Sequence, residues 1–196
     1  MEAIMQKTAW DSGTRLLHVG LSTTLTFELF DGFWVSDPDT RLYFIIHEWV
    51  GLLAATVLMV EWLWIYADGQ SKILFPWNSN GRSVIKTDIL ALFKGKLPQA
   101  GRTVGLPGFW HGIGILSMTG LAITGVLIFL VIPGGRGASS SSAGATAFTT
   151  LSGVHREISY VAWVYWIGHV SAAIIHQVRG DPVFRAIFLG TTRLRK

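Results

Sequence analysis

The chain of 196 residues contains no cysteine. This absence excludes disulfide bonds, cysteine-ligated iron–sulfur clusters, zinc thiolate sites, covalently attached c-type haem and thiol redox chemistry. Charged residues are scarce as well: they make up 14% of the sequence, against about 25% in a typical soluble domain. Any redox-active group must therefore be held by other side chains, and the six histidines are the natural ligands.

Apolar sequence, by contrast, is abundant and makes up 50% of the residues. It is gathered in long blocks, and a helix needs about 20 mostly apolar residues to cross a bilayer. We therefore predict an all-α integral membrane protein, a single domain over residues 1–196 built as a bundle of four transmembrane helices. The predicted spans are residues 14–35, 42–66, 108–132 and 154–178. The first span is the most polar, so one of its faces should point into the bundle.

The segments between the spans differ in composition. Residues 36–41 form a short acidic turn, residues 67–107 a long basic loop, and residues 133–153 a Gly- and Ser-rich loop that we expect to be flexible. Of the 16 Lys and Arg residues, all but Arg41, Arg136 and Arg156 lie in the termini, in the long loop or at the helix ends that adjoin them. The positive-inside rule then places both termini and the long loop in the cytoplasm. In a membrane protein this location of the charge matters more than the net charge of +4, and we expect no nucleic-acid partner.

The beginning of the chain carries no recognisable export signal. Residues 1–13 are polar, and the first apolar stretch lacks an A-x-A-like site. We therefore expect no cleavable signal peptide.

The most informative pattern is a pair of histidines fourteen residues apart, His155 and His169, in the last predicted span. Fourteen residues are close to four helical turns, so both rings leave the same face, about 21 Å apart along the axis. The hydrocarbon core is about 30 Å thick. His47 shares the periplasmic depth of His155, and His18 shares the cytoplasmic depth of His169. Two such pairs suit two stacked haems with two axial histidines each, an arrangement typical of electron transfer because no coordination position stays open.

Two further histidines lie at the cytoplasmic level. His111 begins the third span and remains an alternative to His18 as the partner of His169. His176 follows His169 by seven residues, roughly 10 Å further out along the helix. That distance favours a helix-end or quinone-site role for His176 over iron ligation.

Other residues near the histidines allow more than one interpretation. Glu61 follows the second-span histidine by fourteen residues, and it could relay protons to a quinone or stand in water at the membrane edge. Glu28 and Asp31 are interpreted only as marking the exit of the first span. Glycines such as Gly51 and Gly168 could let flat macrocycles approach the helices.

Short motifs surround these histidines. They are R-L-L-H at Arg15–His18, H-E-W-V-G at His47–Gly51, G-L-P-G-F-W-H-G at Gly105–Gly112, M-T-G-L at Met118–Leu121, G-V-H-R-E at Gly153–Glu157, and G-H-V at Gly168–Val170 followed by I-I-H-Q-V-R-G. With these motifs the chain resembles the cytochrome b (gamma) subunits of membrane-bound formate dehydrogenase and of nickel–iron hydrogenase-type respiratory complexes. The resemblance covers most of the chain, from about Trp10 to Lys196. The fourteen-residue histidine spacing is its most specific element.

This resemblance implies two haem b groups and a quinone site. The ligand sets it implies are His47 with His155 on the periplasmic side, and His18 with His169 on the cytoplasmic side. The quinone site would lie beside the cytoplasmic haem at the start of the third span, where this chain has Trp110 and His111. The formate dehydrogenase branch usually has an amide side chain near this point, so His111 departs from that branch.

We therefore expect a membrane-anchoring dihaem cytochrome b subunit of a respiratory oxidoreductase in the bacterial inner membrane, an electron-transfer subunit and not an enzyme alone. It would exchange electrons between the quinone pool and a periplasmic iron–sulfur or haem subunit docked over residues 31–41 and 133–155. The alternatives are a stand-alone cytochrome b that oxidises quinol, a metal transporter lined by histidines, and a structural anchor with idle histidines. Transporters usually place polar ligands at mid-membrane depth, whereas these histidines lie at two levels near the faces.

Overall fold

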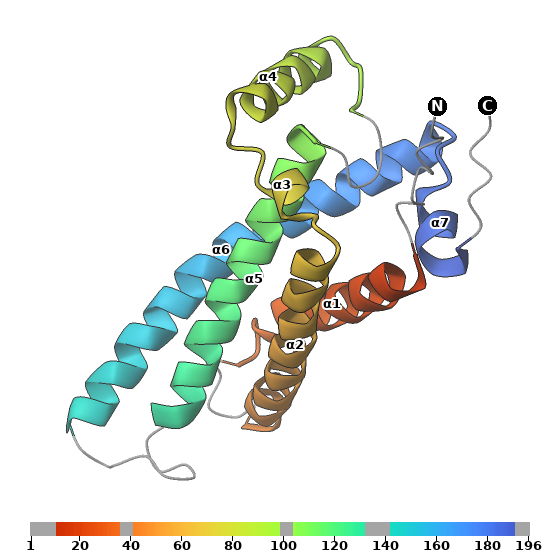
Figure 1. Cartoon of the computed structure of the whole chain (residues 1–196). Helices are drawn as coiled ribbons and strands as arrows, with labels where there is room; N and C mark the ends of the chain where they lie inside the picture. Colours follow the sequence, from red (N-terminus) through yellow and green to blue (C-terminus); the bar gives the residue numbers. More distant parts are fainter. Residues whose placement is uncertain (1–10, 36–40, 99–103, 132–141, 191–196) are drawn as a thin grey trace. The chain divides into compact units, whose positions relative to one another are not determined.

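The computed structural model describes residues 11–35, 41–98, 104–131 and 142–190. Within these ranges the chain forms seven helices and no strand (Figure 1). The helices are α1 (Ser12–Asp31), α2 (Arg41–Ala67), α3 (Ser71–Leu74), α4 (Ser79–Phe93), α5 (Leu106–Val131), α6 (Ser142–Val178) and α7 (Val183–Leu189). The prediction of an all-α fold is confirmed.

Three of the described helices are long and apolar enough to cross a membrane. These segments are Leu42–Ala67, Leu106–Val131 and Gly144–Val178. No more than 22% of the most apolar stretch of each is buried inside the protein, and large side chains such as Leu53 and Val164 are exposed. Apolar surface on this scale is unfavourable in water and marks contact with lipid. These three helices therefore present lipid-compatible faces.

Helix α1 differs from these three because one of its faces is polar. It has 20 residues but is not among the helices apolar enough to span a membrane. The buried Thr24 donates its hydroxyl to the carbonyl of Gly20 at 2.9 Å, and Trp166 of α6 donates its indole N–H to Thr26 at 2.8 Å. The polar face of α1 thus points into the protein, as expected, while its predicted crossing of the membrane stays a prediction.

The start of α6 corrects the sequence interpretation. We expected a flexible loop over residues 133–153, but α6 begins at Ser142 and runs without interruption to Val178. Residues 142–153 contain alanines such as Ala145 and Ala147, which are the strongest helix formers, and they outweigh the Gly and Ser residues of the same segment. The rest of the predicted loop, residues 132–141, lies outside the described residues.

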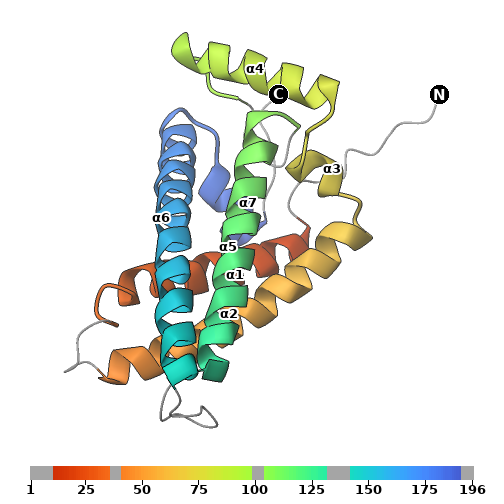
Figure 2. The same cartoon turned by 90° about the vertical axis from the view of Figure 1, so that its left-hand side faces the viewer.

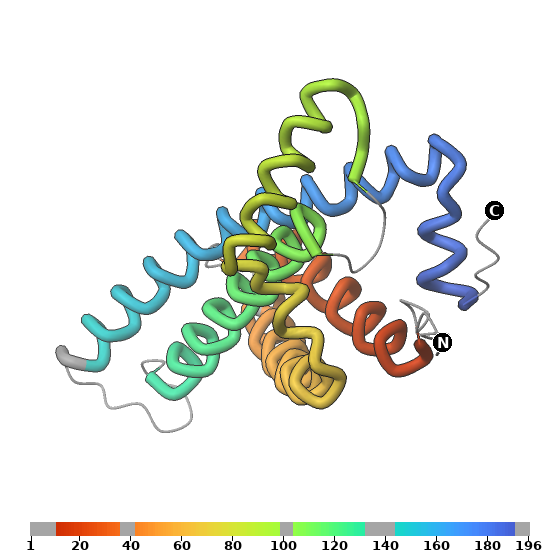
Figure 3. Tube along the Cα trace, turned by 45° about the horizontal axis from the view of Figure 1, so that its top comes forward, coloured from red at the N-terminus to blue at the C-terminus, as the bar shows by residue number. Residues whose placement is uncertain are grey.

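The predicted basic loop between the second and third spans also contains helices. Figure 3 follows the chain from the end of α2 through the single turn of α3 into α4. Asn78 begins α4 by accepting a hydrogen bond from the backbone N–H of Gly81 at 2.7 Å, a typical N-cap. The expectation of a loop throughout residues 67–107 is therefore wrong for α3 and α4, because the N-cap signal was overlooked.

The described helices group into two compact units. The first unit comprises Met1–Val19, Trp62–Gly112 and Gly168–Lys196; the second comprises Gly20–Glu61 and Ile113–Ile167. In the second unit a Cβ at Gly114 would meet the ring of Tyr165, and one at Gly120 would lie 3.1 Å from Ile158. Glycine therefore lets α5 and α6 pack closely there, side by side in Figure 2.

Candidate functional site

The six histidines divide between the two units. The second unit contains His47 and His155, and the first contains the other four, which are His18, His111, His169 and His176. These are the same two sets of histidines that the sequence placed at the periplasmic and the cytoplasmic level of the membrane. In the part of the chain that the structure describes, no three His, Asp or Glu side chains gather as ligands for a bare metal ion.

In the second unit, His47 of α2 and His155 of α6 face each other. Their ring centres are 6.2 Å apart and their planes are inclined by 79°. The Nδ1 atom of His47 lies 2.8 Å from Glu28 Oε2 and 3.6 Å from Asp31 Oδ2, both on α1. The Nδ1 atom of His155 lies 2.8 Å from the hydroxyl of Thr124 on α5. Because a polar group engages each Nδ1, Nε2 is the nitrogen that can bind a metal, the arrangement usual for ligating histidines.

In the first unit, His18 of α1 and His169 of α6 form a second pair. Their ring centres are 6.0 Å apart, with planes inclined by 44°. His111 of α5 lies closer to His169, at 4.9 Å and nearly perpendicular. The His111 Nδ1 is 2.7 Å from the carbonyl oxygen of Pro107, so it donates to the preceding helical turn. The shorter distance leaves less room for an iron between His111 and His169 than between His18 and His169.

The two 6 Å separations fit a haem iron placed between the rings. Metal–imidazole bonds are about 2 Å long and a ring centre lies about 1 Å beyond its nitrogen, so two axial imidazoles have centres roughly 6 Å apart. The measured separations are 6.2 Å for His47 with His155 and 6.0 Å for His18 with His169. The side chains present therefore fit a haem with two axial histidines in each unit.

Trp110 lies beside His169 in the first unit. A Cβ at Gly168, the residue before His169, would be 2.7 Å from the indole of Trp110. The space that we expected Gly168 to leave for a macrocycle is therefore filled by Trp110. Trp110 contacts the residue before His169, and the His111 ring lies 4.9 Å from that of His169; the quinone site that the sequence placed at Trp110 and His111 stays a prediction.

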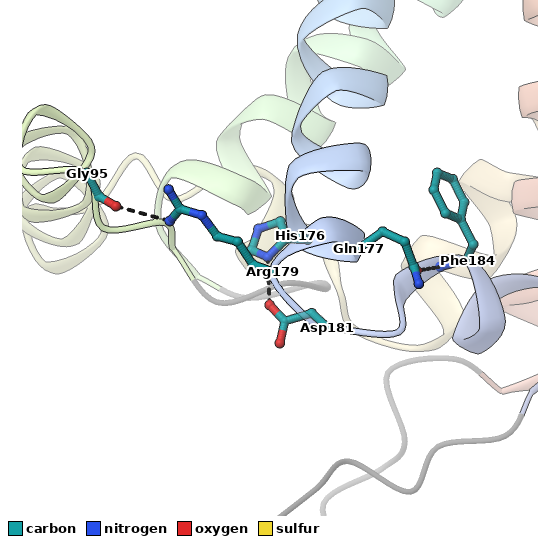
Figure 4. Close-up of polar contacts among 6 residues, drawn as sticks. All are labelled: Gly95, His176, Gln177, Arg179, Asp181 and Phe184. Carbon is teal, nitrogen blue, oxygen red and sulfur yellow. Dashed lines mark hydrogen bonds and ion pairs between the residues drawn. The ribbon is translucent and has the colours of Figure 1, made fainter.

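The end of α6 carries a buried imidazole that is linked to an exposed carboxylate (Figure 4). His176 is buried, and its Nδ1 lies 2.9 Å from Asp181 Oδ2, whose side chain is 57% exposed. Beside this pair, Arg179 donates to the backbone carbonyl of Gly95 at 3.0 Å. Asp181 and His176 thus connect water to the interior of the first unit, a geometry that suits proton exchange.

Glu61 does not stand in water. It is 2% exposed and is the last residue of the Gly20–Glu61 segment of the second unit. The interpretation of Glu61 as a carboxylate at the aqueous membrane edge is therefore wrong, and its role as a proton relay stays a prediction.

Sequence reasoning missed three residues that contact the histidines of the second unit, namely Glu28, Asp31 and Thr124. A signal for the first two was present, since residues three apart on a helix share a face and both lie at the predicted depth of His47. Interpreting them as markers of the helix exit overlooked it. Nothing in the sequence connects Thr124 with His155, because the contact depends on how α5 packs against α6.

Comparison with known proteins identifies the family of this chain. The family model described as prokaryotic cytochrome b561 matches residues 9–190, a region that contains all six histidines and every described helix. No curated protein and no solved structure matches this sequence. The chain therefore belongs to the prokaryotic cytochrome b561 family, whose members are membrane-embedded electron-transfer proteins that bind haem b.

Proposed function

We propose that this cytochrome carries electrons through two haem b groups between a redox partner protein and the membrane quinone pool. The observation that supports the proposal most directly is the presence of two histidine pairs with ring centres 6.2 and 6.0 Å apart. Two axial histidines leave iron no open position, so such a site favours electron transfer over oxygen binding.

In this proposal each unit holds one haem. The ligands are His47 with His155 in the second unit, and His18 with His169 in the first. The haem iron supplies reversible one-electron oxidation and reduction. The protein holds and orients the rings: the Glu28 carboxylate lies 2.8 Å from the Nδ1 of His47, and the Thr124 hydroxyl engages His155.

Quinone binds beside the His18–His169 pair, against Trp110 and His111. Since His111 donates from Nδ1 to the Pro107 carbonyl, the Nε2 of its neutral ring can accept a hydrogen bond from a quinol hydroxyl. The indole of Trp110 supplies a flat apolar wall. Asp181 and His176 exchange with water the protons that accompany quinone chemistry, with the buried Glu61 as a further candidate for this relay.

The protein is a subunit of a larger complex in the bacterial inner membrane, with both termini in the cytoplasm. The partner is an iron–sulfur or haem protein on the periplasmic side, docked over residues 31–41 and 133–155. Because residues 142–153 belong to α6, the second part of this docking surface includes the first turns of that helix.

Purification through a tag on this chain in mild detergent should recover the partner. Recovery of the chain alone, fully loaded and reducing quinone from a small soluble donor, would favour the stand-alone cytochrome.

The deciding experiment is a count of haem in the purified protein. A pyridine haemochrome assay should give two b-type haems per chain, and the absorption spectrum should show six-coordinate, low-spin iron. One haem or none would contradict the proposal. A high-spin spectrum would show that the iron lacks one of its axial histidines.

A further inference from the structure

Two carboxylates of α1 are buried against one of the proposed haem ligands. The side chains of Glu28 and Asp31 are 14% and 4% exposed, and the nearer oxygens lie 2.8 and 3.6 Å from His47 Nδ1. The two residues are one turn apart and share a face of α1. Carboxylates in the interior of a membrane protein are expensive to bury, and they mark functional positions by default.

The orientation of both carboxylates points to His47. Within the described residues, Glu28 Oε1 and Asp31 Oδ2 are buried and accept no hydrogen bond. The Glu28 carboxylate also lies over Gly51, one turn after His47, where an added Cβ would be 3.5 Å from Glu28 Oε2. A surface carboxylate would turn to water, whereas Glu28 is held with its Oε2 atom 2.8 Å from His47 Nδ1.

The two histidines of this pair have unlike partners. The Nδ1 of His47 lies 2.8 Å from a carboxylate oxygen of Glu28, and the Nδ1 of His155 lies 2.8 Å from the hydroxyl of Thr124. A hydrogen bond to a charged group is about twice as strong as one between neutral groups. It also draws the Nδ1 proton away from the ring, so Nε2 becomes a more basic ligand. A more electron-donating ligand and a nearby negative charge both stabilise ferric iron over ferrous iron.

We infer that Glu28, supported by Asp31, is a positioning residue that fixes the tautomer of His47 and lowers the midpoint potential of the haem held by His47 and His155. The inference rests on the proposed dihaem function and adds that side chains of α1 set the potential of one of the two haems. A side chain that contacts an iron ligand is one of the established means by which a protein sets the potential of a haem.

The test is a redox titration of the purified, haem-loaded protein that resolves both haems. Glu28→Gln keeps the size of the side chain and a hydrogen-bond acceptor but removes the charge. It should leave two haems per chain and shift the oxidised-to-reduced equilibrium of one haem about tenfold toward the reduced form, a rise of 59 mV for one electron. The other haem should keep its potential.

Two further variants separate tuning from general effects. Glu28→Asp keeps the carboxylate but moves it away from the His47 ring. The midpoint potential of the affected haem should therefore shift less than in Glu28→Gln. Glu157→Gln removes a carboxylate that is 69% exposed in the same unit, and it should shift neither potential.

The outcomes distinguish this inference from the function on which it rests. A wild-type protein with fewer than two haems contradicts the proposed function. Two haems with unchanged potentials in Glu28→Gln overturn the tuning role alone. Equal shifts in Glu28→Gln and Glu157→Gln, or loss of one haem in both Glu28 variants, also overturn it, since the first indicates a general charge effect and the second a purely structural role.

Discussion

The two units hold histidine pairs of nearly equal separation in very different surroundings. In the second unit, the rings of His47 and His155 are contacted by Glu28, Asp31 and Thr124. In the first unit, the histidine pair is accompanied by the imidazoles of His111 and His176 and by the indole of Trp110. The exposed carboxylate of Asp181 contacts His176. A nearly equal separation of the histidine rings is thus combined with different neighbouring chemistry.

This difference indicates that the two units are suited to different functions. The contacts in the second unit hold ligand rings in place, which is what a site that only passes electrons requires. In the first unit, His111 and His176 supply imidazole groups, the side chains that proteins most often use to transfer protons. Quinone chemistry couples electrons to protons, so the first unit is the one equipped for it.

Replacing the histidines should have the largest effect and tests the equivalence of the two pairs. His155→Ala should remove the haem of the second unit and His169→Ala that of the first, because each site loses one of only two axial ligands. The haemochrome assay should fall from two haems to one in each case. His111→Ala is the matched control and should retain both haems. If it loses one while His18→Ala keeps two, the pairing in the first unit is wrong.

The next largest effect should distinguish the units by function. His111→Leu removes the Nε2 acceptor but leaves the four proposed ligands intact. Haem content should stay at two, while the rate at which a quinone analogue oxidises the reduced haems should fall at least tenfold, as is usual when an acid–base group is lost. Glu157→Gln, an exposed position of the second unit, should leave that rate unchanged. Equal slowing by both substitutions would remove the functional distinction between the units.

A smaller effect is expected at the exposed end of the first unit. Asp181→Asn removes the carboxylate that joins His176 to water, so proton transfer in quinone turnover should slow several-fold. The solvent deuterium isotope effect on turnover should increase as well, because proton transfer becomes more rate-limiting. Haem content and potentials should not change. An unaltered rate and isotope effect would show that protons enter by another route.

The sequence predicted those features that depend on a single helix. The phase of His155 and His169 follows from helical periodicity, and the apolar blocks specify the three long helices. The start of α6 was missed because its first turns contain Gly and Ser, although Ala145 and Ala147 favour helix. Composition alone does not show whether the helix preference of Ala or the loop preference of Gly and Ser prevails.

Contacts between helices were the least predictable part of the site. The approach of Glu28 to His47 depends on the rotation of α1 about its own axis, and the position of Trp110 against Gly168 depends on the fit of α5 to α6. Both are consequences of tertiary packing, which a pattern along one helix does not contain. The ligand residues could therefore be proposed from sequence, whereas the side chains that contact them required the structure.

The smallest effects concern packing, and they compare the glycines of the two units. A Cβ at Gly112, in the first unit, would strike the backbone carbonyl of Leu74, whereas one at Gly120, in the second, would meet the side-chain end of Ile158 at 3.1 Å. Backbone cannot move aside easily, but a side chain can change rotamer. Gly112→Ala should therefore cost about 1–3 kcal/mol of unfolding free energy, the usual penalty of overpacking.

Gly120→Ala should cost less than Gly112→Ala, because the roughly 1 kcal/mol by which alanine favours a helix over glycine offsets the displacement of Ile158. Gly153→Ala is the control: its Cβ would meet nothing within 4 Å, so the same preference should stabilise the protein. Thermal unfolding in detergent, followed by circular dichroism, should rank the melting temperatures Gly153→Ala, Gly120→Ala and Gly112→Ala from highest to lowest. If Gly112→Ala and Gly120→Ala lowered the melting temperature equally, the helices of the first unit could separate as easily as the Ile158 side chain can rotate.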